Sequence, residues 1–94
     1  MYYLLKTRII YTRHCLRRIK ERRVSISDIQ EAIEHPVQLV YDTWNEVYIA
    51  VSIKGIAIVY AFHGNYIEVL TVLGKREYEA LASKYGRSRY KVIY

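Results

Sequence analysis

The first third of the chain carries apolar residues at the spacing of an α-helix. Cys15, Leu16 and Ile19 form one apolar stripe, and Thr12 is a residue type that favours the N-cap position. We therefore predict a first helix from Thr12 to about Arg23. Before it, Tyr2 to Ile10 is rich in β-branched and aromatic residues but alternates only weakly, which is consistent with a strand.

A second, shorter helix follows. Ser27 and Gln30 fit the capping box, in which two side chains satisfy the free amide groups at a helix start. Ile29, Ala32 and Ile33 give this helix one apolar face. Pro36 ends it, because a residue that precedes proline is driven away from helical backbone angles.

From Gln38 onward the pattern changes to the period of two that is typical of strands. Glycine-containing turns at 54–55 and 64–65 separate the apolar runs as hairpin turns do. The predicted strands are Gln38–Trp44, Glu46–Lys54, Ile56–His63 and Tyr66–Leu73. Because their connections are short, we expect a four-stranded antiparallel meander.

After Gly74 the helical period returns, with Tyr78, Leu81 and Tyr85 on one face and Gly86 as the stop. The basic tail, residues 87–94, has three open interpretations: a frayed terminus, an added edge strand, or an arm that orders on binding. The fold class is therefore α+β, one domain over residues 1–94. We expect the first two helices to pack on one face of the meander, burying Leu16, Ile19, Ile29 and Ile33 against Val47, Ile49, Val51 and Ile53.

The composition narrows the class of protein. The chain has 94 residues, of which 52% are hydrophobic, and no apolar run is long enough to cross a membrane. Nothing at its start resembles a signal peptide, so we expect a cytoplasmic location and no membrane partner. The single cysteine, Cys15, lies in the apolar stripe, where a small buried hydrophobic role is expected.

The net charge of +6 is unevenly distributed: residues 1–23 carry +7, residues 24–72 carry −5 and residues 73–94 carry +4. If the two ends meet in the fold, they form one positive face that would attract the phosphates of RNA. A solvated surface that keeps the protein soluble is the alternative. The eleven tyrosines permit base stacking but also suit a half-buried sheet.

A cationic ridge on the first helix carries the candidate chemistry. His14, Arg18 and Arg22 stand four residues apart, so their side chains lie one above the other. The helical drift leaves His14 and Arg18 free to face a ligand and brings Arg22 toward the apolar stripe, where Asp28 or Glu31 would be its ion-pair partner. Histidine can move protons near neutral pH and arginine can hold a phosphate, although a surface histidine without a role is the alternative.

The same stretch resembles the DUF4258 family of small domains. The resemblance covers residues 11–73. The residues that match the family pattern are His14, Arg18, Arg22, Ser27, Ala32 and Pro36. That family is grouped with RelE-like and BrnT-like toxins in a ribonuclease superfamily. The family usually has glycine where this chain has Arg23, which favours a longer first helix here. Related ribonuclease folds tend to keep a polar catalytic residue on the last strand, and the resemblance implies this role for Thr71.

These observations predict a toxin-like, metal-independent endoribonuclease without a cofactor, with His14, Arg18 and Thr71 as candidate catalytic residues. The spacing of histidines and acidic residues along the chain does not indicate a metal site. An acidic antitoxin covering the basic face is the partner that this function implies, and a homodimer is compatible with it. The alternatives are a non-catalytic nucleic-acid-binding protein and an interaction module that pairs through a sheet edge. The predicted nucleic-acid contacts are Arg13, Arg17, Arg22, Lys75, Arg76, Arg87 and Arg89.

Overall fold

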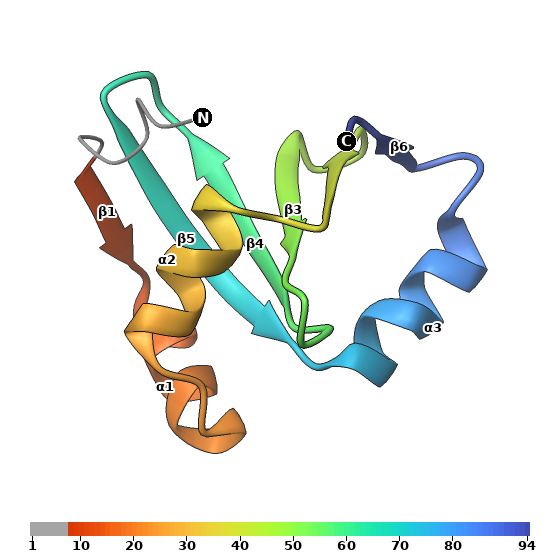
Figure 1. Cartoon of the computed structure of the whole chain (residues 1–94). Coiled ribbons are helices and arrows are strands. Elements are labelled where there is room, and N and C mark those ends of the chain that lie inside the picture. The colour runs from red at the N-terminus through yellow and green to blue at the C-terminus, as the bar shows by residue number, and fades with distance from the viewer. Residues whose placement is uncertain (1–7) are drawn as a thin grey trace.

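The computed structural model describes residues 8–94, which form a mixed α/β fold (Figure 1). Three helices lie within this range: α1 (Arg13–Arg22), α2 (Ile26–Glu34) and α3 (Lys75–Tyr85). The strands of the same range are β1 (Arg8–Tyr11), β2 (Gln38–Asp42), β3 (Val47–Val51), β4 (Ala57–Phe62), β5 (Tyr66–Leu73) and β6 (Tyr90–Val92). The N-terminal strand predicted from Tyr2 is thus seen from Arg8, and residues 2–7 lie outside the described residues.

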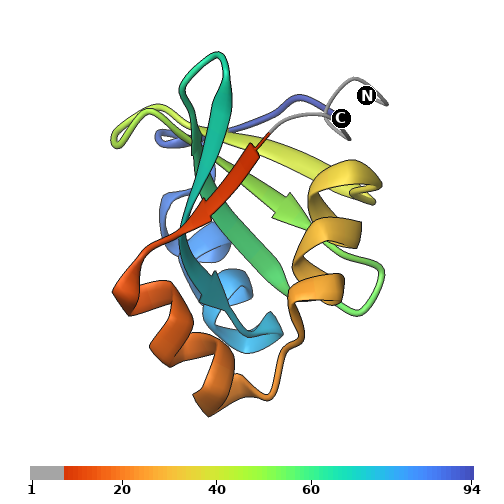
Figure 2. The same ribbon diagram turned by 90° about the vertical axis from the view of Figure 1, so that its left-hand side faces the viewer.

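The sheet of the described chain has six strands in the order β1-β5-β4-β3-β2-β6. The four predicted strands, β2 to β5, are consecutive antiparallel neighbours within it. The four-stranded meander is not the whole sheet, because β1 pairs with β5 in parallel at one edge (Figure 2) and β6 pairs with β2 at the other. A parallel partner more than fifty residues away leaves no local pattern in the sequence. Of the three interpretations of the tail, residues 90–92 adopt the edge strand.

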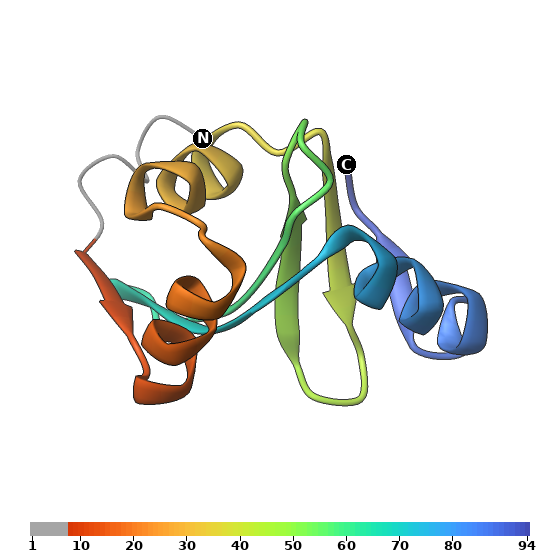
Figure 3. The ribbon, with the colours of Figure 1, turned by 90° about the horizontal axis from the view of Figure 1, so that it is seen from below.

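Helices cover both faces of the sheet (Figure 3). On one face, Cys15 of α1 and Ile29 and Ile33 of α2 pack against the apolar side chains of the central strands. On the other face, α3 places Tyr78 and Leu81 over Val40 and Ile49. The sheet is therefore a middle layer with helices on both faces, although Ile10 on β1 and Phe62 on β4 remain 42% and 44% exposed.

The predicted orientation of β3 is wrong for this reason. Tyr48 and Ala50 face α1 and α2, whereas Ile49 and Val51 face α3. Two other residues expected in the core are exposed: Ile53 lies in the turn after β3 with 86% of its surface accessible, and Leu16 is 47% exposed. A period of two indicates that side chains alternate, but when both faces are covered it does not show which helices each face meets.

The helices begin with capping residues of the predicted kinds, but the cap of α2 lies at a different position from the one predicted. The Cys15 amide donates to Thr12 Oγ1 at 3.0 Å, so Thr12 is the N-cap of α1 as predicted. The capping box of α2 is formed by Ser25 and Asp28, two residues before the predicted pair, Ser27 and Gln30. Arg23 closes α1 in a left-handed conformation, with a φ of 55°.

Cys15 is fully buried, as predicted, and burial raises the pKa of its thiol. Within residues 8–94, no helix has the length and hydropathy that a membrane crossing requires.

Candidate functional site

A groove of about 380 Å³ lies on the α3 side of the sheet. Its apolar lining comes from the sheet and from α3: Val47, Ile49, Val59, Leu70, Leu73 and Leu81. Its other lining residues are His14, Asp42, Asn45, Thr71, Arg89 and Tyr90. An apolar hollow with a few convergent polar groups, and of this size, is typical of a site that binds a small molecule or part of a larger ligand.

His14 and Thr71, both candidate catalytic residues, line this groove together. His14 is the second residue of α1, and the start of that helix is fixed to β5. The Thr12 amide donates to the Val69 carbonyl at 3.1 Å, and Thr12 Oγ1 donates to the Leu70 carbonyl at 2.9 Å. The N-cap thus places the exposed imidazole at the groove that Thr71 also lines, and within residues 8–94 that imidazole has no hydrogen-bond or ion-pair partner.

Arg18 is less free to bind a ligand than its place on the cationic ridge suggested. Its guanidinium donates to the Val72 carbonyl, through Nε at 3.3 Å and Nη2 at 3.2 Å, and also to Glu77 Oε1 at 2.6 Å. Only 20% of its side chain is exposed. Arg18 thereby ties α1 to the end of β5 and to the first turn of α3.

Arg22 also pairs with Glu77, so the predicted partners Asp28 and Glu31 are wrong. The same Glu77 oxygen accepts a hydrogen bond from the Gly74 amide at 3.0 Å. That amide, followed by the two guanidiniums, lowers the pKa of the Glu77 carboxyl although its partial burial opposes the shift. The side chain of Arg22 is 36% exposed, more than that of Arg18, which reverses the order expected from helical drift.

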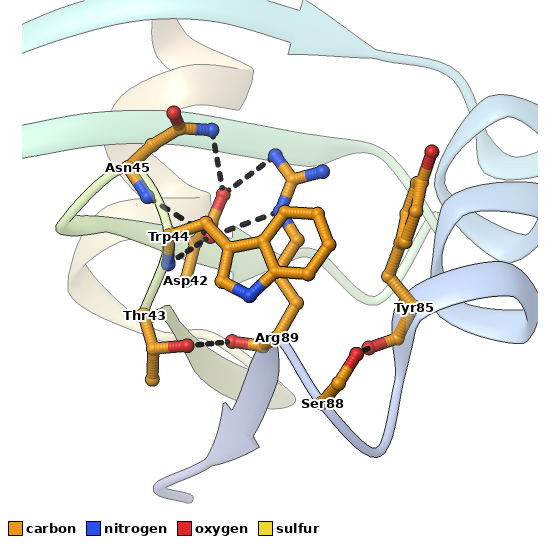
Figure 4. A network of polar contacts seen from close by, with 7 residues as sticks. All are labelled: Asp42, Thr43, Trp44, Asn45, Tyr85, Ser88 and Arg89. Atoms are coloured by element: carbon orange, nitrogen blue, oxygen red, sulfur yellow. Dashed lines mark hydrogen bonds and ion pairs between the residues drawn. The ribbon is translucent and has the colours of Figure 1, made fainter.

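A buried ion pair between Asp42 and Arg89 forms another wall of the groove (Figure 4). Arg89 donates to both carboxylate oxygens, from Nε at 3.0 Å and from Nη2 at 2.8 Å. Asp42 also accepts from the amides of Trp44 and Asn45 and from the Asn45 side chain. Burial alone would raise the pKa of Asp42, but the hydrogen bonds from Arg89 and the turn outweigh it and lower the pKa.

Sequence reasoning assigned Arg89 to nucleic-acid binding and did not identify Asp42 or Asn45. The spacing of Asp42, Trp44 and Asn45 is typical of a turn in which an aspartate accepts the following amides, so the turn itself has a local signal. The ion pair has none, because Asp42 and Arg89 are 47 positions apart. With 17% of its side chain exposed, Arg89 is largely occupied by Asp42.

The remaining predicted nucleic-acid contacts lie outside the groove on the surface. Arg13 and Arg17 are exposed on α1, Lys75 and Arg76 are exposed at the start of α3, and Arg87 is exposed in the connection to β6. Since Glu77 joins α1 to α3, the basic residues of the N-terminal block and those that begin the C-terminal block lie on neighbouring elements. Over residues 8–94, no three His, Cys, Asp or Glu side chains gather closely enough to hold a metal ion.

Comparisons with protein-family models, with curated proteins and with solved structures found no match to this chain. The resemblance to the DUF4258 family therefore stays a prediction from the residues that carry it.

Proposed function

We propose that this protein is a metal-independent endoribonuclease of the toxin type and that the groove is its site. One observation carries the proposal: His14 and Thr71, chosen from sequence for different reasons, line the same groove although they come from a helix and a strand far apart in the chain. Cleavage of RNA without a metal needs proton transfer and stabilisation of the charge that accumulates on the phosphate; His14 would supply the first, and the Thr71 hydroxyl would contribute a hydrogen bond to the second.

In the proposed reaction, the RNA 2′-oxygen attacks the adjacent phosphorus as the bond to the 5′-oxygen breaks. His14 accepts the 2′-hydroxyl proton, and the resulting imidazolium can return that proton to the leaving 5′-oxygen. The products are a 2′,3′-cyclic phosphate and a 5′-hydroxyl. Thr71 would donate a hydrogen bond to a phosphate oxygen, while Arg13 and Arg17 hold neighbouring phosphates.

Arg18 receives a positioning role in this proposal. Its guanidinium already binds Glu77 and the Val72 carbonyl, so it holds α1 against β5 and thereby keeps His14 at the groove that Thr71 lines. An acidic antitoxin segment would inhibit such an enzyme by covering the exposed arginines of α1.

The test is cleavage of single-stranded and structured RNA in the presence of EDTA. We expect the wild-type protein to cleave and His14→Ala to lose about 10²–10⁴-fold in rate. Thr71→Val, which removes only the hydroxyl, should lose about tenfold or more. His35→Ala is the matched control, because His35 is an exposed histidine at the end of α2 and does not line the groove. Equal rates for wild type and His14→Ala would contradict the proposal.

A second candidate is a nucleic-acid-binding protein without catalysis. The observation that favours it is a shortage of groups that can donate a proton to the leaving oxygen. The groove contains the carboxyl of Asp42 as well as His14, but the lowered pKa of Asp42 keeps that carboxyl ionised near neutral pH, so it cannot act as an acid. RNA binding by the wild-type protein with no cleavage under any of these conditions would decide for this candidate.

A further inference from the structure

Trp44 is the single tryptophan of the chain, and it lies in the turn between β2 and β3. Its side chain is 58% exposed, although its neighbours in the turn are fixed by the buried ion pair. A lone exposed hydrophobic residue is ordinary on a protein surface. Its surroundings, however, set Trp44 apart from the other exposed apolar residues of the described chain.

Hydrogen bonds fix the backbone of the turn that carries Trp44. Its amide donates to Asp42 Oδ1 at 3.0 Å, and the preceding Thr43 donates to the Arg89 carbonyl from both its amide, at 2.9 Å, and its hydroxyl, at 2.8 Å. The indole lies 5.3 Å from the Arg89 guanidinium carbon and 5.3 Å from the centre of the Tyr85 ring (Figure 4). A ring that is already ordered can stack on a ligand with little further loss of conformational entropy.

Two exposed cations lie on the segment whose Tyr85 and Arg89 contact the indole, although Arg89 itself is paired with Asp42 and Glu46 is exposed in the same turn. Arg87 is exposed two residues before Arg89, and Lys84 stands over the Tyr85 ring at 5.2 Å. An exposed aromatic face beside cations is the combination with which proteins bind single-stranded nucleic acids, since the ring stacks on a base while the cations meet the phosphates.

Trp44 also lies beside one end of the groove that contains the proposed site of cleavage. Three of the side chains around it, Asp42, Asn45 and Arg89, line the groove that contains His14 and Thr71. A nucleotide stacked on the indole would therefore sit at the edge of the groove, with its strand able to continue into it.

From this arrangement we infer that Trp44 is the stacking platform for an unpaired base of single-stranded RNA. The inference rests on the proposed function and adds to it a substrate class, since a base that is paired within a duplex has no face to offer the indole. The role also differs from that of a cover over the Arg89 ion pair, because a cover would leave the indole environment unchanged when RNA binds.

The experiment follows two signals in one titration of the full chain with a fluorescently labelled single-stranded RNA oligomer. Anisotropy of the label reports binding, and emission of the single tryptophan reports stacking. A duplex of the same strand and an abasic ribose-phosphate oligomer of the same length serve as probes without an available base. We expect the single strand to quench the tryptophan over the concentration range in which anisotropy rises, and the other two probes to bind more weakly without quenching.

Variants extend the test. Trp44→Ala should weaken single-strand binding by about five- to a hundredfold, and Trp44→Phe should restore part of it, because a phenyl ring still stacks. Phe62→Ala is the matched control: Phe62 is 44% exposed on β4 but does not line the groove, so its loss should leave both signals unchanged. If Trp44→Ala does not fold, quenching of the wild-type protein still decides the point.

Two outcomes overturn the inference in distinguishable ways. Anisotropy that rises without any change in tryptophan emission removes Trp44 from the site and leaves the proposed ribonuclease intact. No binding of any RNA at low salt removes the proposed function, and the platform with it.

Discussion

Asp42 is the one charged residue that is buried among residues 8–94, and five hydrogen bonds meet its carboxylate. A buried carboxylate is tolerated only while its partners stay in place. Without them, the free-energy cost of removing its charge from water is not offset by hydrogen bonds or an ion pair. The pair with Arg89 joins the turn after β2 to the segment that leads into β6. Single substitutions here therefore test how the wall of the groove is held.

Asp42→Ala should lower the free energy of unfolding by about 3 kcal/mol, the lower end of the range for breaking a buried ion pair. Arg89 would be left partly buried with its charge unpaired. Urea unfolding followed by circular dichroism measures the change, with Glu79→Ala as the control for removing an exposed carboxylate. The double variant Asp42→Leu with Arg89→Met should be more stable than Asp42→Ala; a double variant that is no better would show that the turn depends on the charges themselves.

The lowered pKa of Asp42 sets the direction of an acid effect. A carboxyl whose pKa is lower in the folded than in the unfolded protein contributes stability above its unfolded pKa, near 3.9 for aspartate, and loses it as the pH falls through the folded pKa. Stability should thus fall below about pH 4, with Asp28 and Glu77, whose pKa values are also lowered, contributing in the same range. Asp42→Asn should be less stable at pH 7 and lose less on acidification, as urea unfolding at pH 7, 5, 4 and 3 would show. An unchanged acid dependence would contradict the assignment.

At the scale of elements, Glu77 joins two helices that lie on opposite faces of the sheet. Its carboxylate binds Arg18 and Arg22 of α1 and the Gly74 amide that precedes α3. A Cβ at position 74 would stand 2.9 Å from a guanidinium nitrogen of Arg22, so a larger residue there would make that flexible side chain shift. The end of β5 is thus the place where both helical layers are tied together.

Arg18→Ala should destabilise the protein by about 1.5–3 kcal/mol, because it removes charge-assisted hydrogen bonds to Glu77 and to the Val72 carbonyl. Arg22→Ala should cost less than about 1 kcal/mol, since its partly exposed ion pair is screened by solvent. Thermal unfolding of the two variants compares them directly. A larger loss for Arg22→Ala would restore the order that helical drift suggested from sequence.

The sequence pattern predicted the elements better than their arrangement. Most residues that act on near neighbours were interpreted correctly: Thr12 caps α1, Pro36 follows the end of α2, and Gly55 and Gly64 turn the hairpins with positive φ angles. The exception is the capping box of α2, which Ser25 and Asp28 form two residues before the predicted pair. Pairings between residues far apart in the chain were not predicted. The partners of β1, of Asp42 and of Arg22 lie about fifty positions away in the chain, and no spacing along the sequence reports them.

For the whole molecule, the decisive property is the excess of positive charge on neighbouring elements. If the protein binds RNA, each phosphate neutralised contributes a slope of about −0.7 to a plot of log affinity against log salt for a single strand. Replacing Arg13 and Arg17 together by alanine should make that slope shallower by about 1.4. Anisotropy titrations between 50 and 200 mM salt measure the slope, with Lys91→Ala on β6 as the control. An affinity that does not change with salt would leave the positive charge as a solvated surface.

The parallel pairing of β1 with β5 has a consequence for the order of folding. During synthesis, β1 and α1 emerge first, yet β5 and the Val69 and Leu70 carbonyls that receive Thr12 are made more than fifty residues later. The hairpins from β2 to β5 close short loops, whereas docking of β1 closes a long one and bears the larger entropic cost. Since His14 lies two residues after Thr12, we expect the groove to gain its histidine only when β1 docks, and a nascent chain that ends before Tyr66 would carry the cationic segment 13–22 without β5 to hold it.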